Sequence, residues 1–329
     1  MSLLLTEDEI RSVLDMENSI QAVEAAFKAY GEGRVNMPPK AYLYLPKGDF
    51  RAMYGEIKGF NGGGICGLKW VNVHPENPDR GLPTVMAKIL LNDPENALEL
   101  ADMDGTCITN MRTGAAGAVA AKYLSRIDSR IAGFIGAGQQ ARTQLAGLLR
   151  VRAIKEVKVY DINKGRAVAF CNEMSEIHDI DINPVDTVTE AVKNSDIVTT
   201  VTPSRKPIVN LRNISRGTHL NAIGADAKGK EELDPLILKN SKIVIDDWEQ
   251  ASHSGEVNVP LEKGIISKDD IYATLGEIVT GKKGRTNDEE ITVFDSTGLI
   301  IQDLALAYLA YKLCKDENMG EEKLFLSRR

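Results

Sequence analysis

A glycine-rich turn near the middle of the chain has the spacing of a phosphate-binding loop. The apolar run 132–135 leads into Gly136-Ala137-Gly138-Gln139-Gln140-Ala141, a G-x-G-x-x-A pattern, and a helical pattern follows at once. In such a turn the first glycine permits a tight bend. The second lets the backbone approach a pyrophosphate, and the helix that follows presents free N–H groups. The same pattern also occurs where a turn only packs a helix on a sheet. Because a strand precedes it, we expect Gly136, Gly138, Gln139 and Gln140 to contact a nucleotide.

An acid at the end of the next apolar run predicts the type of nucleotide. Residues 157–160 form that run, and Asp161 follows it. A carboxylate in this place accepts hydrogen bonds from ribose hydroxyls and repels a 2′-phosphate, so NAD is favoured over NADP. Lys164 and Arg166 follow closely and could soften this preference, but solvated charges at the start of a helix explain them better.

Three basic residues before the glycine turn are candidates for binding an anion. Lys69 lies in an apolar segment where strand alternation puts it on the opposite face from Leu68 and Trp70. A lysine in a strand is usually a solvated edge residue, and the same interpretation applies to Arg51. Arg112 precedes the small residues 113–117, which permit close approach by a ligand or, equally well, by another helix.

Acidic and polar residues follow two later strand patterns. Asp226 comes after the strand pattern 219–223 and a Gly-Ala turn. Ligands of a doubly wound sheet bind at the carboxyl ends of its strands, so Asp226 is a candidate for catalysis, although a loop-capping aspartate explains it equally well. Asp295 and Ser296 end the strand pattern 292–294 and begin a helix-capping cluster.

Composition restricts the class of protein. The chain has 329 residues and a net charge of −7, with no basic block that suggests nucleic-acid binding. No signal peptide and no apolar run of membrane-spanning length is visible. Four scattered cysteines and four scattered histidines lack the spacing of metal ligands. We therefore expect a soluble cytoplasmic protein with free thiols, no metal site, and no nucleic-acid or membrane partner.

The order of the predicted elements indicates an α/β protein with two lobes. In residues 1–125, helices at 7–13 and 19–30 precede strands at 41–45, 51–54, 66–73, 84–91 and 97–101, which suggests a mainly antiparallel sheet. A helix rich in Gly and Ala is predicted at 113–124. From 126 to 298, strands alternate with helices, which predicts a Rossmann-type doubly wound parallel sheet. We expect the helix at 299–313, within the segment 299–329, to return to the first lobe.

Together these segments resemble the ornithine cyclodeaminase/μ-crystallin family over nearly the whole chain. The resemblance rests on Arg51, on segments 67–72, 74–75, 81–83 and 112–116, on Gly136-Ala137-Gly138, and on segments 202–204, 221–226 and 294–298. The sequences of segments 37–40, 203–207, 228–234 and 255–259 are most similar to those of archaeal-type alanine dehydrogenases. The resemblance is far more specific for the family than for the reaction.

The resemblance implies a homodimer. The first lobe, which is an α+β lobe separate from the Rossmann domain, supplies the dimer contact. It implies that Arg51, Lys69 and Arg112 hold the carboxylate of a small amino acid. Lys69 and Asp226 then act as the acid–base residues. Thr113, Thr202, Asn221, Asp295 and Ser296 join the glycine turn and Asp161 as cofactor-binding residues.

Several activities are compatible with this set of residues. The favoured one is NAD-dependent oxidative deamination of a small L-amino acid, L-alanine, to pyruvate and ammonia. Ornithine cyclodeaminase with tightly held NAD is the first alternative. Ketimine reductase, or a μ-crystallin-like binder of nucleotide without catalysis, is the second.

Overall fold

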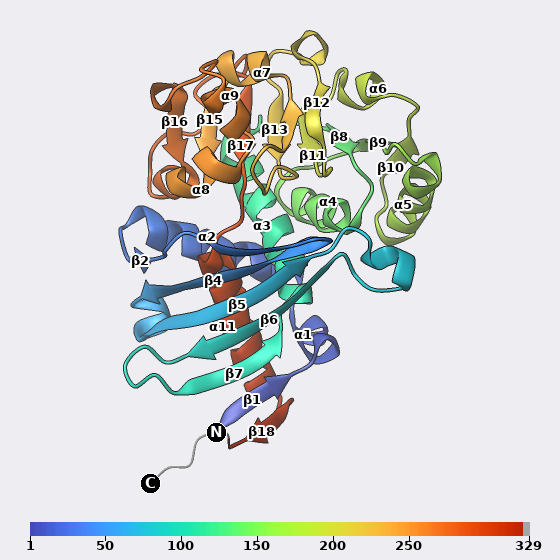
Figure 1. Cartoon of the computed structure of the whole chain (residues 1–329). Coiled ribbons are helices and arrows are strands. Elements are labelled where there is room, and N and C mark those ends of the chain that lie inside the picture. The colour runs from blue at the N-terminus through green and yellow to red at the C-terminus, as the bar shows by residue number, and fades with distance from the viewer. Residues whose placement is uncertain (325–329) are drawn as a thin grey trace. The chain divides into compact units, whose positions relative to one another are not determined.

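The computed structural model describes residues 1–324 of the chain as two compact units (Figure 1). The first comprises Met1–Arg112 and the segment from Leu299 onward, and the second comprises Thr113–Gly298. The sequence predicted a division after residue 125. The structure instead divides the chain inside helix α3 (Thr106–Leu124), because small residues after Arg112 let this helix pack against a helix of the second unit.

The first unit is built on one sheet with strand order β18-β1-β7-β6-β5-β4-β2, with β3 also paired to β4. All these pairs are antiparallel except β1 with β7. The strands are β1 (Ser2–Leu5), β2 (Val35–Asn36), β3 (Ala41–Leu45), β4 (Gly48–Lys58), β5 (Gly64–Val73), β6 (Val85–Asn92), β7 (Glu99–Asp104) and β18 (Glu321–Lys323). The helices are α1 (Glu7–Val13), α2 (Met16–Gly31) and α11 (Ile300–Asp316), together with the start of α3.

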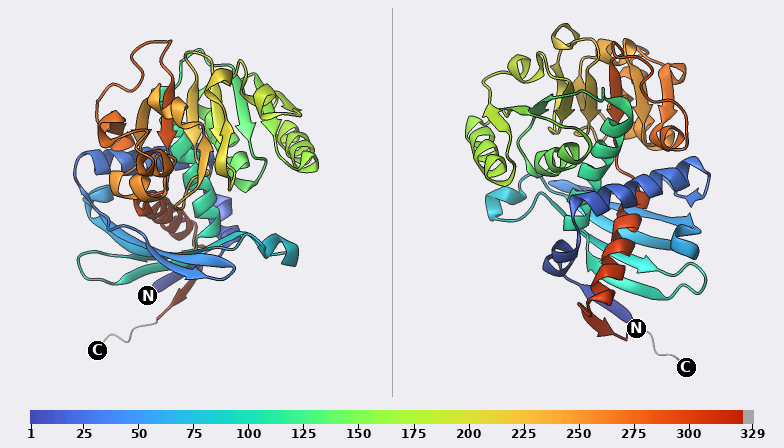
Figure 2. Two further views of the ribbon diagram at one scale, coloured as in Figure 1. Left: turned by 45° about the horizontal axis from the view of Figure 1, so that its top comes forward. Right: turned by 180° about the vertical axis from the view of Figure 1, so that it is seen from behind.

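Helix α11 covers one face of this sheet and contacts β4, β5, β6 and α2 (Figure 2, right). Glycine permits this close packing at Gly67 on β5, where a Cβ atom would lie 2.8 Å from the Leu304 Cδ2 of α11. Strand alternation therefore decides which residues of β4 and β5 meet α11. Met53, Ile65, Lys69 and Val71 lie on the buried face.

The opposite face of the same sheet carries apolar side chains that the described chain leaves exposed. Tyr54 of β4 and Trp70 of β5 are 46% and 42% exposed. Phe50 stacks on Trp70 with ring centroids 5.0 Å apart, and Tyr54 lies opposite Leu68 in register. An apolar surface on a sheet is typical of a protein–protein contact.

The second unit contains an all-parallel sheet with strand order β10-β9-β8-β11-β13-β17-β15-β16. Its strands are β8 (Ile131–Ile135), β9 (Glu156–Tyr160), β10 (Asp181–Pro184), β11 (Ile197–Thr200), β13 (His219–Ala222), β15 (Lys242–Ile245), β16 (Ile271–Thr274) and β17 (Thr292–Asp295). A small parallel pair, β12 (Arg205–Val209) with β14 (Glu231–Leu233), lies outside it. The helices are α4 (Gln139–Val151), α5 (Lys164–Ile177), α6 (Val188–Val192), α7 (Pro235–Lys239), α8 (Trp248–Ser254), α9 (Asn258–Glu262) and α10 (Leu275–Val279).

Two apolar cores lie against this sheet. One joins β8 and β9 to helices α3, α4 and α5, with Phe134 and Phe170 at its centre. The other joins β8, β11, β13 and β17 to α6, α7 and α8. Helices on both faces of a parallel sheet define a doubly wound α/β fold, as the sequence predicted.

The C-terminal end of α3, which belongs to the second unit, is held by two arginines. The Arg152 side chain donates to the carbonyl oxygens of Ala121 at 2.9 Å and Lys122 at 2.8 Å. Arg285 Nε donates to the carbonyl oxygen of Leu124 at 2.7 Å. These cations satisfy carbonyl groups that the helix end leaves without intrahelical partners, and their charge suits the negative end of the helix dipole.

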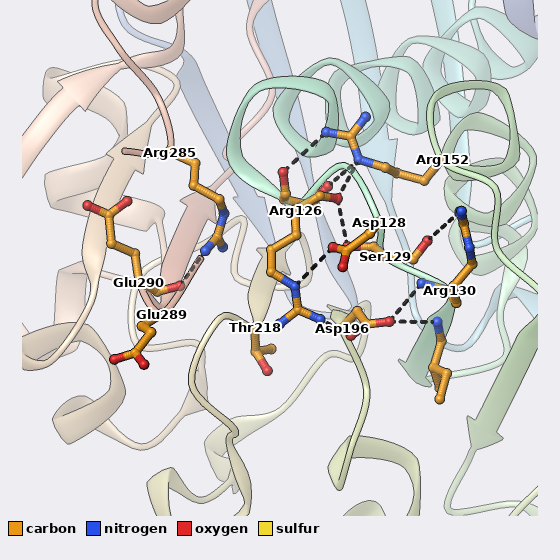
Figure 3. Close-up of polar contacts among 12 residues, drawn as sticks. Arg126, Asp128, Ser129, Arg130, Arg152, Asp196, Thr218, Arg285, Glu289 and Glu290 are labelled. Atoms are coloured by element: carbon orange, nitrogen blue, oxygen red, sulfur yellow. Dashed lines mark hydrogen bonds and ion pairs between the residues drawn. The ribbon is translucent and has the colours of Figure 1, made fainter. Parts of the chain in front are cut away.

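The charged residues of Figure 3 lie at the amino-terminal edge of the parallel sheet. Asp196, just before β11, accepts from the backbone N–H groups of Arg130 and Ile131 at 2.7 and 2.9 Å, and its side chain pairs with Arg126. Ligands of such sheets bind at the opposite, carboxyl edge. This cluster therefore has a structural role.

Several element bounds differ from those predicted. Helix α3 begins at Thr106, seven residues earlier than predicted, with Asp104 accepting from the N–H groups of Thr106 and Cys107. Strands β1, β2, β10, β12, β14, β16 and β18 were not predicted, because each has five residues or fewer and shows little alternation. Within residues 1–324, no helix is long and apolar enough to cross a membrane.

The close contact of α3 with α4 gives a test of the core that joins these helices to β8 and β9. A Cβ atom at Gly114 would lie 2.8 Å from the Thr143 Cβ and closer still to its carbonyl group. We expect Gly114→Ala to lower the free energy of unfolding by about 1–3 kcal/mol, the usual cost of overpacking. Gly165→Ala is the matched control, because this α5 glycine is exposed and alanine should stabilise the helix by about 0.5–1 kcal/mol. Denaturant unfolding of both variants measures this. Equal stability of the two variants would contradict the packing described here.

Candidate active site

Lys69 is buried on a central strand rather than solvated at an edge. It lies on β5, between β4 and β6, and its side chain faces α11 with no exposed surface. The alternation that exposes Trp70 directs Lys69 inward. The edge interpretation of this lysine is therefore wrong, and the ammonium group needs a partner inside the protein.

That partner is Asp303 of α11, which is also fully buried. Lys69 Nζ donates to Asp303 Oδ1 at 2.7 Å, and Arg112 Nε donates to the same oxygen at 3.1 Å. Arg112 Nη1 also donates to Gln302 Oε1 at 3.1 Å. One carboxylate thus holds two cations together, which leaves the cluster with one unit of positive charge when Lys69 is protonated.

Arg51 lies on the same face of the sheet as Lys69. In the β4–β5 register it is opposite Val71, so Lys69 is its diagonal neighbour, about 7–8 Å away in an ordinary sheet. Its guanidinium group donates to the Asp49 carboxylate at 2.7 and 3.3 Å and lies over the Tyr42 ring. The structure therefore gathers the three predicted basic residues, Arg51, Lys69 and Arg112, in one unit.

Two buried polar atoms of this cluster have hydrogen-bonding capacity left over. Within residues 1–324, Asp303 Oδ2 and Gln302 Nε2 have no hydrogen-bond partner. Buried polar atoms are nearly always paired, so such atoms mark a place that a ligand can satisfy. The cluster can bind a carboxylate with its cations and an amine with Asp303 Oδ2.

Burial also changes the acidity of Lys69. It lowers the pKa of this ammonium group from 10.5 to about 7, although the attraction of Asp303 opposes the change. The positive charge of Arg112 contributes to the same lowering of the Lys69 pKa. A lysine with this pKa can accept and release a proton near neutral pH.

The glycine turn of the second unit has the backbone geometry of a phosphate loop. Gly136 has φ = 103°, a left-handed conformation that favours glycine, and a Cβ atom there would lie 2.9 Å from the Val201 carbonyl oxygen. Gly138 is the N-cap residue of α4, and a Cβ atom there would meet nothing within 4 Å. The space over the turn is therefore open to a ligand at the positive end of the helix dipole.

Arg142, one turn into α4, supports this loop from behind. It donates to the carbonyl oxygens of Ala137 and Gly138, both at 3.1 Å, and pairs with Glu173. Because C=O and N–H point in opposite directions in a trans peptide, the N–H groups of Gly138 and Gln139 are directed away from Arg142.

Asp161 follows β9, as predicted, and its carboxylate reaches the glycine turn. It accepts from the N–H groups of Ala137 at 2.9 Å and Asn163 at 2.8 Å. Each carboxylate oxygen has a second lone pair, so Asp161 can still accept from a ribose hydroxyl.

The other predicted cofactor residues fall into two groups. Thr202 follows β11 at the carboxyl edge of the sheet, while Thr113 and Ser296 are buried. The Asn221 amide, by contrast, donates to the Gly117 carbonyl oxygen at 3.1 Å and bonds to His219 at 3.0 Å. The Asp295 carboxylate accepts from the N–H groups of Glu256 and Val257. These last two side chains make hydrogen bonds inside the unit, and the prediction that they contact a cofactor stays a prediction.

Asp226 lies in the loop after β13 and is paired with Lys230, which the sequence did not single out. The Lys230 Nζ also donates to the Gly224 carbonyl oxygen at 3.3 Å, so this lysine ties the loop to its own base. The sequence also missed Asp303. A buried polar pair, Gln302-Asp303, inside an otherwise apolar helix was the available signal.

No group of residues within 1–324 has the composition of a metal site. The parallel sheet, the glycine turn and the acid after the second strand are those of dinucleotide-binding α/β proteins.

Comparison with known proteins identifies the family. The model of the ornithine cyclodeaminase/mu-crystallin family matches residues 1–318. An alanine dehydrogenase of Archaeoglobus fulgidus is 50% identical over 325 residues, which cover 98% of each chain. The solved structure of an archaeal alanine dehydrogenase dimer with bound NAD has a TM-score of 0.94 at 49% identity, covering 99% of each chain.

A second solved structure is similar to nearly the same degree. Thermococcus litoralis Δ1-pyrroline-2-carboxylate reductase, in complex with NADH and L-proline, has a TM-score of 0.94 at 41% identity and covers 98% of this chain and 100% of its own. The chain therefore belongs to the ornithine cyclodeaminase/mu-crystallin family, which confirms the resemblance found in the sequence.

The lowered pKa of Lys69 gives a test that does not depend on activity. Between pH 7 and pH 9 the unfolded chain keeps this lysine protonated, while the folded chain releases the proton. The free energy of unfolding of the parent protein should therefore rise with pH relative to that of Lys69→Met. Denaturant titrations of both proteins at several pH values measure the difference. Two curves that stay parallel over this range would show that the buried lysine has an ordinary pKa.

Proposed function

We propose that this protein catalyses the NAD-dependent, reversible oxidative deamination of a small L-amino acid, with L-alanine giving pyruvate and ammonia. The observation that carries the proposal is the buried Lys69–Asp303–Arg112 cluster. Two cations held by one acid in a buried site contribute little to stability, but they suit the carboxylate of a small substrate. A relative named alanine dehydrogenase at 50% identity supports the choice of substrate.

The second unit has the residues to hold NAD. Its glycine turn offers open space and outward N–H groups for the pyrophosphate, and Asp161 offers acceptors for the ribose hydroxyls. Asp161 would repel a 2′-phosphate, which favours NAD over NADP. When bound, NAD⁺ accepts a hydride from the substrate Cα.

In this proposal the first unit binds and deprotonates the amino acid. Arg51 and Arg112 donate charge-assisted hydrogen bonds to the substrate carboxylate, which fixes its orientation. Lys69, with its pKa near 7, takes a proton from the substrate ammonium group, so that the nitrogen lone pair can form the imine. Asp303 holds Lys69 in place while this proton moves.

Asp226 is proposed to act on the water that hydrolyses the imino acid. A carboxylate in a loop at the carboxyl edge of the sheet can accept the proton of that water as it attacks the imine carbon. Lys230 is paired with Asp226 and holds this carboxylate in place. In the reverse direction the same carboxylate returns the proton.

We also propose that the protein forms a homodimer through the exposed apolar face of the first sheet. That face carries Tyr54 and Trp70, which residues 1–324 leave exposed, and the half-buried Phe50, which stacks on Trp70. The related archaeal alanine dehydrogenase is described as a dimer. A second copy of the chain would bury these rings.

Ketimine reduction is the second candidate. The relative solved with NADH and L-proline at 41% identity favours it. Its cyclic imine substrate also has a carboxylate on the reacting carbon, so the same cationic cluster would bind it. The two candidates differ in whether the reacting nitrogen leaves as ammonia.

Product analysis separates these activities. With NAD⁺ and L-alanine we expect NADH, pyruvate and ammonia to form in equal amounts, because the hydride is transferred once per turnover. L-ornithine converted to proline without net NADH would instead establish a cyclodeaminase. NADH formed from L-proline but not from L-alanine would establish a ketimine reductase acting in reverse.

Substitution of Asp226 tests its assigned role. Asp226→Asn keeps the shape of the side chain and removes the base, so we expect turnover with L-alanine to fall about 10²-fold, as for loss of a general base. NADH affinity, measured by fluorescence, should stay within about twofold, because hydrogen bonding to the cofactor is not assigned to this residue. Asp269→Asn is the control, since that acid is exposed and distant from Asp226 in the sequence. Turnover of Asp226→Asn near that of the control would remove Asp226 from the mechanism.

A further inference from the structure

Three buried carboxylates join the ends of neighbouring strands in the second unit. Strands β11, β13 and β17 lie side by side in the sheet, and Asp295 ends β17. Glu256 follows α8, and Glu232 lies in β14. The side chains of Asp295, Glu256 and Glu232 have no exposed surface.

The three side chains form a series in which each carboxylate holds the backbone beside the next. Asp295 accepts from the N–H groups of Glu256 at 2.9 Å and Val257 at 3.1 Å. Glu256 accepts from the N–H groups of Glu232 at 2.9 Å and Leu233 at 2.6 Å. Asp295, at the end of β17, thus fixes the position of the Glu232 backbone through Glu256.

The Glu232 side chain then connects the ends of two other strands. Its Oε1 accepts from the backbone N–H of Thr202 at 2.8 Å and from the Thr202 hydroxyl at 2.7 Å. Its Oε2 accepts from the backbone N–H of Gly224 at 3.0 Å. Thr202 follows β11 and Gly224 follows β13, so one carboxylate fixes both ends.

Gly224 is also the base of the loop that carries Asp226. Its carbonyl oxygen accepts from the N–H of Asp226 at 3.1 Å and from Lys230 Nζ at 3.3 Å. A Cβ atom at Gly224 would lie well inside the contact distance of Glu232 Oε2, so the close approach requires glycine. A shift of Glu232 would therefore shift the Gly224 peptide, which holds Asp226 in position.

This arrangement is costly in free energy. Burial raises the pKa of Glu232, and burial together with the nearby charge of Glu232 raises the pKa of Glu256 well above its usual range. The hydrogen bonds to Glu232 and Glu256 described above come from backbone N–H groups and one hydroxyl rather than from a cation. Such costly groups gather at functional sites, where geometry matters more than stability.

We propose that Glu232 is a positioning residue for catalysis. Through Thr202 it fixes the loop after β11, which has the predicted NAD contact, and through Gly224 it fixes the loop after β13, which carries Asp226. Glu232 itself is assigned no contact with NAD or with the amino acid. The proposal rests on the proposed function, because Thr202 and Asp226 have their roles only there.

Glu232→Gln tests it in the full chain. Glutamine keeps the size of the side chain but replaces one acceptor oxygen with an NH₂ group, which would face an N–H of Thr202 or Gly224. We expect turnover with L-alanine to fall about tenfold or more and the NADH dissociation constant to rise about fivefold, as expected when positioning groups are displaced. The melting temperature should stay within about 3 °C, because a costly buried charge is removed.

The matched control is Glu231→Gln. Glu231 is the neighbouring residue and is also buried, but its carboxylate lies 3.4 Å from Lys263 Nζ instead of holding the strand ends. We expect turnover and NADH binding of this variant to remain within about twofold of the parent, since neither loop depends on it. Equal losses in both variants would mean that burial of any acid in β14 matters, and would overturn the proposal.

A double variant separates positioning from a merely structural role. If Glu232 acts through Asp226, turnover of Glu232→Gln/Asp226→Asn should equal that of Asp226→Asn alone. Losses that multiply would overturn this role of Glu232.

If Glu232→Gln does not fold, Glu232→Asp keeps the charge but shortens the reach, and the same criteria apply. If Asp226→Asn alone is fully active, the proposed function has failed at Asp226. The NADH measurement then still decides whether Glu232 positions the Thr202 loop, with unchanged binding counting against it.

Discussion

The buried carboxylate of Asp303 is the constraint on which the first unit depends. Two cations, Lys69 and Arg112, could not remain inside a protein without an anion between them, because the cost of removing charge from water is several kcal/mol per ion. Asp303 reaches them only because α11 lies close against the sheet. Gly67 suits that approach, since a Cβ atom there would lie 2.3 Å from the Leu90 carbonyl oxygen and 2.8 Å from Leu304 Cδ2. The chemistry assigned to the cluster therefore follows from the packing of one helix on one strand.

In the second unit the corresponding constraint is the open carboxyl edge of a parallel sheet. Parallel strands place all their carboxyl ends on one edge, so the glycine turn, Asp161, Thr202 and the Asp226 loop gather there. The amino edge is closed by the arginine cluster that fastens α3. At the carboxyl edge the buried acids Asp295, Glu256 and Glu232 fix the strand ends by hydrogen bonds, and their burial has a cost in stability.

Local signals in the sequence predicted much of this fold. Strand β3 and helix α1 have the bounds that periodicity and turn residues indicated, and the glycine turn occupies its predicted place between β8 and α4. The partners of the site residues were not predictable in the same way. Asp303 is 234 residues from Lys69 in the chain, and no local pattern indicates which buried acid meets which lysine. Nor does the residue type of Asn221 or Asp295 indicate that its side chain forms hydrogen bonds inside the unit, as the structure shows.

A crystal structure with NADH and pyruvate tests the central claim, that the Lys69–Asp303–Arg112 cluster is the carboxylate site, more directly than any kinetic measurement. We predict that the pyruvate carboxylate lies within hydrogen-bond distance, about 2.7–3.2 Å, of the Arg51 and Arg112 guanidinium groups, with Lys69 and Arg112 still bound to Asp303. A carboxylate bound elsewhere, with Lys69 and Arg112 contacting Asp303 alone, would contradict the account.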